Sequence, residues 1–336
     1  MLSRVAESIY WMSRYVERAE NVARFIDVNL QLMLDAPPGT GQQWEPLVAT
    51  TGDHEGFTER YGHPTQQRVI HFLTFDPENP NSVVSCLRAA RENARTVREI
   101  ISSEMWLQLN KFFLMVNDAS AGSAGGDPPP EFFSEVKLAS HLFNGITDAT
   151  MTHGEAWHFA RLGRKLERAD KTSRILDVKY FILLRSVDDI GTPFDDIQWA
   201  AVLRSASAFE MYRKRHGRLS PRAVVEFLLL DREFPRAIHY CLLSARDSLH
   251  AISGTPLGTF RHPPEKLLGQ LGSELSYAAV DEIIAAGLHE YLDDLQTKVN
   301  QVGAGIKETF FAARTPTAPK KRVMEQTQRE QTQRTD

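Results

Sequence analysis

The stretch that decides the fold is residues 2–33, which read LSRVAESIYWMSRYVERAENVARFIDVNLQLM. Its apolar side chains recur at alternating spacings of four and three residues, at Val5, Ile9, Met12, Val16, Ala19, Ala23, Ile26, Leu30 and Met33. This period is that of an α-helix with one apolar stripe, as in a helix that packs in a bundle. A segment rich in proline and glycine follows at residues 35–41 and ends the helix, because proline cannot continue it.

The rest of the chain repeats this helical pattern, and no segment shows the apolar–polar alternation of a β-strand. We expect further helices at residues 80–113, 155–185, 199–215, 221–230 and 235–252, and an interrupted one at 265–311. The sequence therefore predicts an all-α fold, a multi-helix bundle.

An internal tandem duplication is visible in the sequence. Residues 13–28, shifted by 150 positions, match residues 163–178 at seven of sixteen positions, where composition alone gives about one. Residues 69–91, shifted by 155 positions, match residues 224–246 at ten of twenty-three. A period this long is not that of a solenoid. We therefore expect two similar helical halves related by a pseudo-twofold axis.

The expected domain boundaries follow from this duplication and from local composition. A helical domain covers residues 1–314, with a first repeat at about 1–117, a linker rich in Ser, Gly and Pro at about 118–130, and a second repeat at about 131–314. Residues 315–336 are polar and cannot bury a core, so we expect a disordered tail there.

Charge and composition limit the function classes. The chain has 39 Lys and Arg against 43 Asp and Glu, a formal net charge of −4, which offers no overall positive field for nucleic acid. No apolar run reaches the roughly 20 residues that span a membrane, and the first residues do not follow a signal-peptide pattern. We expect a cytoplasmic protein that binds neither nucleic acid nor membrane. The two cysteines, Cys86 and Cys241, occupy equivalent positions, and we expect both to be buried core residues.

The residues that both repeats retain are mostly charged, and they form the candidate site. The charged members are Arg14, Glu17, Arg18, Arg24 and Asp27 in the first repeat, and Arg164, Glu167, Arg168, Arg174 and Asp177 in the second. Solvated charges contribute little to stability and can drift, so their retention indicates that both faces of the helix are occupied. One interpretation is a buried Glu-Arg network that ties the halves together. The other, compatible with it, is a paired site whose arginines bind an anionic group.

Motifs of enzymes are largely missing. The sequence has no Walker A loop, no His-Glu-x-x-His and no Gly-x-Ser-x-Gly. Glu155 and His158 have the Glu-x-x-His spacing of di-iron bundles, but the equivalent position of the first repeat lacks the second pair that such a site needs. We expect no metal and no cofactor, and we favour a role other than that of an enzyme.

Several segments resemble the bacterial alpha-E family, all-helical proteins named for a Glu-Arg motif. The resemblance lies in SIYWMSRYVERAEN at residues 8–21, DPENPNS at 76–82, ARENAR at 90–95 and the second motif copy, LERAD, at 166–170. It covers about residues 1–310.

The resemblance implies partners more than a reaction. Proteins of this family are typically encoded beside, or fused to, a circularly permuted ATP-grasp ligase, often with a transglutaminase-like protease. It implies a non-catalytic accessory protein that holds the peptide substrate or product of such a ligase. Two alternatives stay open: an enzyme that acts on a peptide through the duplicated Glu-Arg clusters, and a purely structural scaffold. Arginines accessible in a shared pocket favour the first two roles, and self-satisfied arginines favour the scaffold.

Overall fold

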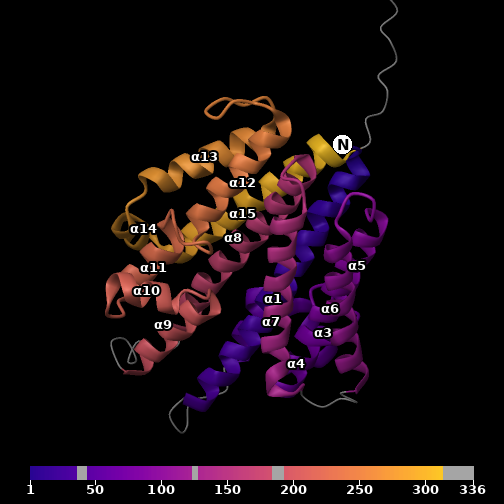
Figure 1. The fold of residues 1–336 in the computed structure, drawn as a ribbon. Coiled ribbons are helices and arrows are strands. Elements are labelled where there is room, and N and C mark those ends of the chain that lie inside the picture. The colour runs from indigo at the N-terminus through magenta and orange to yellow at the C-terminus, as the bar shows by residue number, and fades with distance from the viewer. Residues whose placement is uncertain (36–43, 123–127, 184–192, 313–336) are drawn as a thin grey trace, which may run out of the picture.

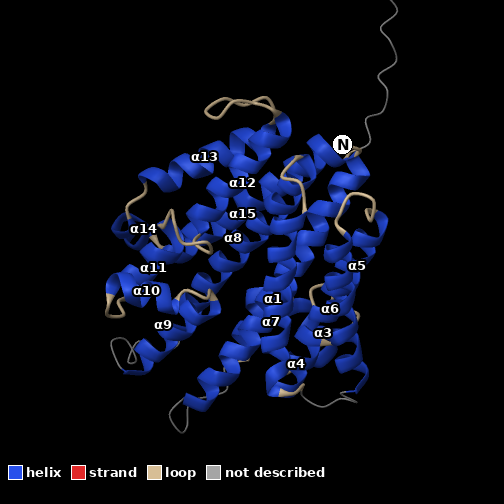
Figure 2. Cartoon of the chain, viewed as in Figure 1, coloured by secondary structure: helices blue, strands red, loops and turns tan. Residues whose placement is uncertain are grey.

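The computed structural model describes residues 1–35, 44–122, 128–183 and 193–312. These residues form helices joined by turns, and none of them lies in a strand (Figure 2). The all-α multi-helix fold predicted from the sequence is confirmed. Within the described ranges, no helix combines the length and the apolar character that crossing a membrane requires.

Two long helices, α1 (Ser3–Asp35) and α8 (Glu155–Leu183), pack against each other in the middle of the molecule (Figure 1). The predicted apolar stripe of α1 is buried, for example at Met12 and Val16. The charged side of the same helix is buried as well, at Glu17. Protein therefore covers both faces of α1, as the retained charges predicted.

The helix α1 belongs to a first group of four helices. The other members are α5 (Val83–Thr96), α6 (Ser103–Gly122) and α7 (Pro130–Thr150). Each member packs on the next, and α7 returns to pack on α1, so the group closes on itself. A side-chain cap fixes the start of α5, because the hydroxyl of Ser82 accepts a hydrogen bond from the backbone N–H of Ser85.

The helix α8 belongs to a second group with the same order of packing. The other members are α12 (Ile238–Ser253), α13 (Pro263–Tyr277) and α15 (Leu288–Ile306), and α15 returns to pack on α8. The second group lies toward the left of Figure 1 and the first toward the right. Two shorter helices cross between the groups: α2 (Glu45–Thr51) packs on α8, and α9 (Pro193–Ser205) packs on α1.

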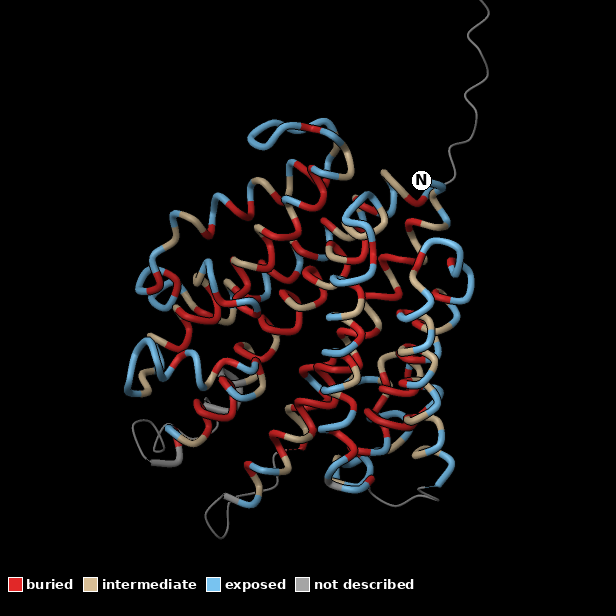
Figure 3. Tube along the Cα trace, in the orientation of Figure 1, coloured by how far each residue is buried: buried red, intermediate tan, exposed pale blue. Residues whose placement is uncertain are grey.

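The remaining elements are short. They are α3 (His54–Tyr61), α4 (Gln66–Thr74), α10 (Phe209–His216), α11 (Pro221–Leu230), α14 (Val280–Ala286) and a π-helical turn at Lys307–Phe311. Buried residues concentrate along the inner faces of the long helices, which together enclose the core (Figure 3).

Details outside the long helices also correspond between the two groups. Arg60 donates to Asp76 at 2.8 Å, and Arg215 makes the equivalent ion pair with Asp231. The two cysteines are fully buried, as predicted, and each thiol lies against the carbonyl of the proline six residues before it. A tandem duplication predicts such correspondences. The duplication itself and the repeat boundaries stay predictions. The helix α7 falls almost entirely within the second predicted repeat, but it packs with the first group of helices.

Two helices that the sequence predicted as continuous are each divided in two. The predicted helix at residues 80–113 is interrupted by a turn after Thr96, and α6 starts where the hydroxyl of Ser102 accepts from the N–H of Met105. The predicted helix at residues 199–215 breaks at Ser207, whose φ of 51° lies in the left-handed region.

The region between the predicted repeats is also more helical than expected. The helix α6 continues to Gly122, inside the predicted linker, and α7 begins at Pro130, a residue suited to a first helical turn. The tail predicted at residues 315–336 lies outside the described residues.

Candidate functional site: two crossed Glu-Arg clusters

The candidate site lies where α1 and α8 cross. Gly163 of α8 lies directly against the backbone of α1, and a Cβ atom at this position would be 2.4 Å from the carbonyl oxygen of Tyr10. A side chain larger than hydrogen would therefore push the helices apart. This close approach brings the Glu-Arg motif of each helix within reach of the other.

Each motif glutamate binds the motif arginine of the opposite helix. Glu17 of α1 accepts hydrogen bonds from Nε and Nη2 of Arg168, both at 2.7 Å. Glu167 of α8 accepts hydrogen bonds from Nε and Nη2 of Arg18, at 2.6 and 3.1 Å. Both are bidentate pairs, the geometry in which arginine binds carboxylate most strongly. We call them the crossed pairs, and together they clamp α1 to α8.

Further groups surround the first of these carboxylates. Arg236, in the turn before α12, donates Nη1 to Glu17 at 3.2 Å and Nη2 to Glu20 at 2.5 Å. The amide of Asn21 also donates to Glu17 at 3.2 Å, and Arg24 donates to Glu20. We call this set the Glu17 cluster; it comprises Glu17, Glu20, Asn21, Arg24, Arg168 and Arg236.

A corresponding set surrounds the second carboxylate. Arg14 donates Nε to Glu167 at 2.7 Å, and Nη1 of Arg18 donates to the amide oxygen of Asn81, in the turn before α5, at 2.6 Å. Next to them, Lys171 and Arg174 pair with Asp170 at 3.3 and 3.1 Å. The Glu167 cluster comprises Arg14, Arg18, Asn81, Glu167, Asp170, Lys171 and Arg174.

Both motif glutamates are fully buried and ionised. Burial alone raises the pKa of Glu17, but the positive charges of Arg168 and Arg236 outweigh it and hold the pKa below its ordinary value. The same balance lowers the pKa of Glu167, through the two arginines that bind it. Although burial lowers the pKa of Arg18, pairing with Glu167 outweighs it and raises that pKa. Carboxylates held ionised in this way carry no proton to donate near neutral pH, so they are unsuited to general acid catalysis.

The arginines that the two motifs use to bind Glu17 and Glu167 are largely covered. The side chains of Arg14, Arg18 and Arg168 expose 14, 16 and 12% of their surface, and each donates to a buried carboxylate. Arg164 differs, because it reaches only Asp148, at 3.4 Å, and its Nε has no hydrogen-bond partner among the described residues. In the structure, the guanidinium groups of Arg14, Arg18 and Arg168 take part in a buried Glu-Arg network, which is the first interpretation of the retained charges. Their binding of an external anion stays a prediction.

Three predicted site residues lie apart from the clusters: Arg164, and the two carboxylates Asp27 and Asp177, which serve the four-helix groups instead. Asp27 of α1 accepts from Nζ of Lys137 on α7 at 2.5 Å, and Asp177 of α8 pairs with Nδ1 of His289 on α15 at 2.6 Å. Each carboxylate therefore ties a central helix to the last helix of its own group.

Sequence reasoning did not single out six members of the clusters, which form three equivalent pairs. Glu20 and Asp170 carry a usable signal, since they occupy equivalent positions and are both acidic. Asn81 and Arg236 are equivalent in position but differ in residue type, so identity between the repeats could not reveal them. The same holds for Asn21 and Lys171, which also differ in residue type. In the described part of the chain, no group of three or more His, Cys, Asp or Glu is placed to hold a metal ion.

Comparison with known proteins agrees with this motif. Residues 1–311 match the model of the Alpha-E family, described as a predicted alpha-helical domain with a conserved ER motif. An uncharacterized protein of Mycobacterium bovis is 26% identical over 320 residues, which cover 87% of this chain and 34% of that protein. Uncharacterized proteins of Mycobacterium tuberculosis match at 26 and 25% identity with the same coverage.

The chain spans about a third of the length of these curated relatives. No solved structure matches it. The family match covers both Glu-Arg motifs and every residue of the two clusters. The chain belongs to the Alpha-E family.

Proposed function

We propose that this chain is a non-catalytic helical partner of an ATP-grasp peptide ligase. In this role it helps the ligase to hold its peptide substrate or product. The observation that carries the non-catalytic part is the reciprocal pairing of Glu17 with Arg168 and of Glu167 with Arg18. These groups use their charge and hydrogen bonds on each other. In this proposal the motif builds a rigid two-part scaffold, and surfaces elsewhere on it contact the ligase and the peptide.

The relatives support a role in association with further protein. About two-thirds of each relative lies outside the match, so there the helical domain is covalently joined to other sequence. A domain that is joined to other sequence in its relatives is a natural candidate for contact with a further protein. We place this partnership in the cytoplasm, where ATP supplies the ligase.

The test combines the purified chain with an ATP-grasp ligase from the same genome. Size-exclusion chromatography with light scattering measures complex formation, and ADP release measures peptide ligation. We expect a complex and faster ligation than by the ligase alone. A ligase that works equally fast without the chain and forms no complex with it would refute the proposal.

Arginine variants then separate scaffold from binding site. Arg18→Lys and Arg168→Lys keep the charge but lose the bidentate pairing. We expect them to lower the melting temperature and, through it, ligation. Arg95→Lys is the matched control, because Arg95 is exposed and its ion pair among the described residues is with Glu92 on the surface. Lysine variants that retain full stability yet lose stimulation of the ligase would instead assign the motif to substrate binding.

A further inference from the structure

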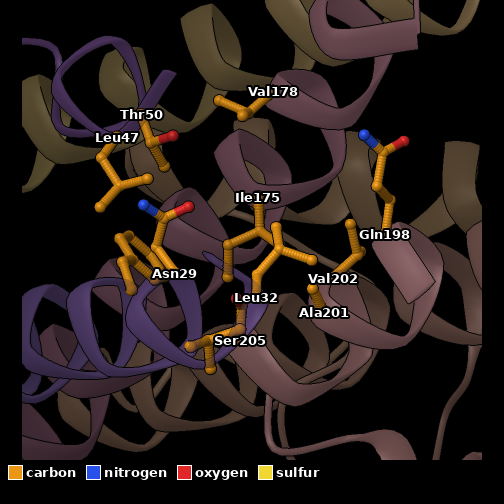
Figure 4. Close-up of a pocket in the computed structure, with 12 residues that line it drawn as sticks. Asn29, Leu32, Leu47, Thr50, Ile175, Val178, Gln198, Ala201, Val202 and Ser205 are labelled. Atoms are coloured by element: carbon orange, nitrogen blue, oxygen red, sulfur yellow. The ribbon is translucent and has the colours of Figure 1, made fainter. Parts of the chain in front are cut away.

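A small apolar pocket lies between the two halves, beyond the crossed pairs along α1 and α8. It has a volume of about 80 Å³ and is lined by residues of α1, α2, α8 and α9 (Figure 4). Four pairs of its lining residues occupy equivalent positions of the two repeats: Phe25 and Ile175, Val28 and Val178, Leu47 and Val202, Thr50 and Ser205. Both repeats therefore contribute matching walls to one pocket.

One polar group in this pocket lacks a partner. Asn29 of α1 exposes 6% of its surface, and its amide nitrogen makes no hydrogen bond among the described residues. Its amide lies beside Leu47 and Ile175 (Figure 4). The hydroxyl of Thr50, by contrast, is used by the carbonyl of Pro46 at 2.7 Å. This nitrogen is covered by its neighbours, and a buried donor without an acceptor is costly. A rotation of the Asn29 amide toward the pocket would therefore let a bound molecule accept its hydrogen bond.

The lining also limits the charge of such a molecule. None of the described residues that form the wall is Asp, Glu, Lys, Arg or His. A carboxylate in this pocket would lose its hydration without a cation in return. The acceptor that fits Asn29 is therefore a neutral carbonyl, and the rest of the molecule must be apolar.

Size narrows the class further. An apolar cavity of about 150 Å³ accommodates a benzene ring. A volume of about 80 Å³ therefore suits three or four aliphatic carbons, the size of a valine or leucine side chain. A peptide offers both parts together, because each apolar side chain is flanked by neutral amide carbonyls.

We propose that this pocket binds an aliphatic side chain of a peptide, with Asn29 donating to the neighbouring peptide carbonyl. The choice of a peptide rests on the proposed function, whereas the aliphatic side chain and the neutral acceptor follow from the pocket alone. In this proposal, the pocket between the two repeats is the place at which the chain holds one residue of the ligase's peptide.

The first test uses the chain without any ligase, so that its failure is distinct from failure of the partnership. N-acetyl-leucinamide is titrated into methyl-labelled protein and followed by NMR. We expect saturable shifts in the millimolar range, centred on methyl groups of Leu32, Ile175, Val178 and Val202. N-acetyl-glycinamide, which lacks the side chain, should produce none. Absence of saturable shifts up to about 20 mM probe would overturn the proposal, because a dissociation constant of that size corresponds to a binding free energy of only about −2 kcal/mol. Equal shifts with both probes would overturn it as well.

Variants test the two parts of the pocket separately. Asn29→Leu removes the donor and keeps the shape, and should weaken binding of N-acetyl-leucinamide by about fivefold. Ser140→Ala is the matched control, since it removes a buried hydroxyl that also lacks a partner, on α7 away from the pocket; binding should not change. Ala201→Leu should fill the cavity and abolish binding in a folded protein. Unchanged binding in both Asn29→Leu and Ala201→Leu would place the probe elsewhere and refute the site.

Discussion

The Glu17 cluster and the Glu167 cluster solve the same problem with different residues. In each, a buried glutamate receives a bidentate arginine from the opposite helix. The supporting cations differ. Glu17 receives Arg236 from the turn before α12, whereas Glu167 receives Arg14 from α1, and Arg164, the equivalent of Arg14, pairs with Asp148 instead. At the positions equivalent to Arg236 and Asn21, the second cluster has a neutral Asn81 in the turn and a cation, Lys171, on the helix, where it pairs with Asp170.

This exchange shows what the buried site requires. The crossed pairs are retained in kind, because only arginine offers the planar pair of donors that a carboxylate accepts. The further positive charge can come from a helix, as with Arg14 and Lys171, or from a turn, as with Arg236, since it supplies charge near a buried carboxylate and little geometry. The crossed pairs are therefore constrained by the shape of the arginine side chain, whereas the positions that supply further positive charge are constrained by charge balance alone.

Removing a motif glutamate should have the largest effect. Glu17→Ala leaves Arg168 and Arg236 buried without their carboxylate, and Glu167→Ala does the same to Arg14 and Arg18. We expect each to lower the free energy of unfolding by about 3–5 kcal/mol, measured by urea denaturation. If both variants melted within a degree of wild type, the clusters would not clamp the helices.

Exchanging the supporting cation sharpens the comparison. Arg236→Asn removes hydrogen bonds to two carboxylates and should cost about 2–3 kcal/mol. Adding Asn21→Lys gives the Glu17 cluster the residue types that the Glu167 cluster has at these two positions and should recover about 1 kcal/mol or more of that loss. If the double variant is no more stable than Arg236→Asn alone, the two positions are not interchangeable sources of charge.

Closing the space at the helix crossing should follow. Gly163→Ala places a Cβ against the backbone of Tyr10 and should cost about 1–3 kcal/mol through overpacking. Gly145→Ala on α7 is the control, because a Cβ there meets nothing within 4 Å; in a helix it should be neutral or stabilising by up to about 1 kcal/mol. Equal effects of the two substitutions would contradict the close crossing.

The smallest predicted effect concerns Lys165, which stands where the first repeat has Tyr15. Burial lowers the pKa of Lys165 to about 8, and its Nζ lies 4.5 Å from the ring centre of Tyr240. Because the unfolded chain holds this proton up to about pH 10, unfolding takes up a proton between these values and stability rises with pH. Relative to Lys165→Met, wild type should gain about 1–2 kcal/mol between pH 7.5 and 9.5. A difference that does not vary with pH would show an ordinary, solvated lysine.

The sequence predicted the helical class and the buried charges for reasons that are local. The regular spacing of apolar residues such as Met12 and Val16 predicts a helix. The recurrence of Glu17 and Arg18 as Glu167 and Arg168 predicts that these charges make contacts within the protein. The break at Ser207 could not be predicted in this way, because the chain there turns to follow tertiary packing without a proline or glycine to mark it.

The partners within the site were beyond sequence reasoning. Glu17 and Arg18 are neighbours in the chain, but each binds a residue about 150 positions away. Which arginine meets which glutamate depends on where α1 and α8 cross, and Gly163 sets that point through contact with a backbone atom. Arg236 joins the Glu17 cluster from a turn whose equivalent in the first repeat holds an uncharged residue.

The most direct test of the crossed pairs is a comparison of two double-mutant cycles, with stability measured by urea denaturation. One cycle combines Glu17→Gln with Arg168→Gln, which are bonded across the helices. The other combines Glu17→Gln with Arg18→Gln, adjacent in the sequence but bonded to different partners. We predict a coupling energy of about 1–3 kcal/mol in the first cycle and within about 0.5 kcal/mol of zero in the second. A larger coupling between Glu17 and Arg18 than between Glu17 and Arg168 would contradict the clamp.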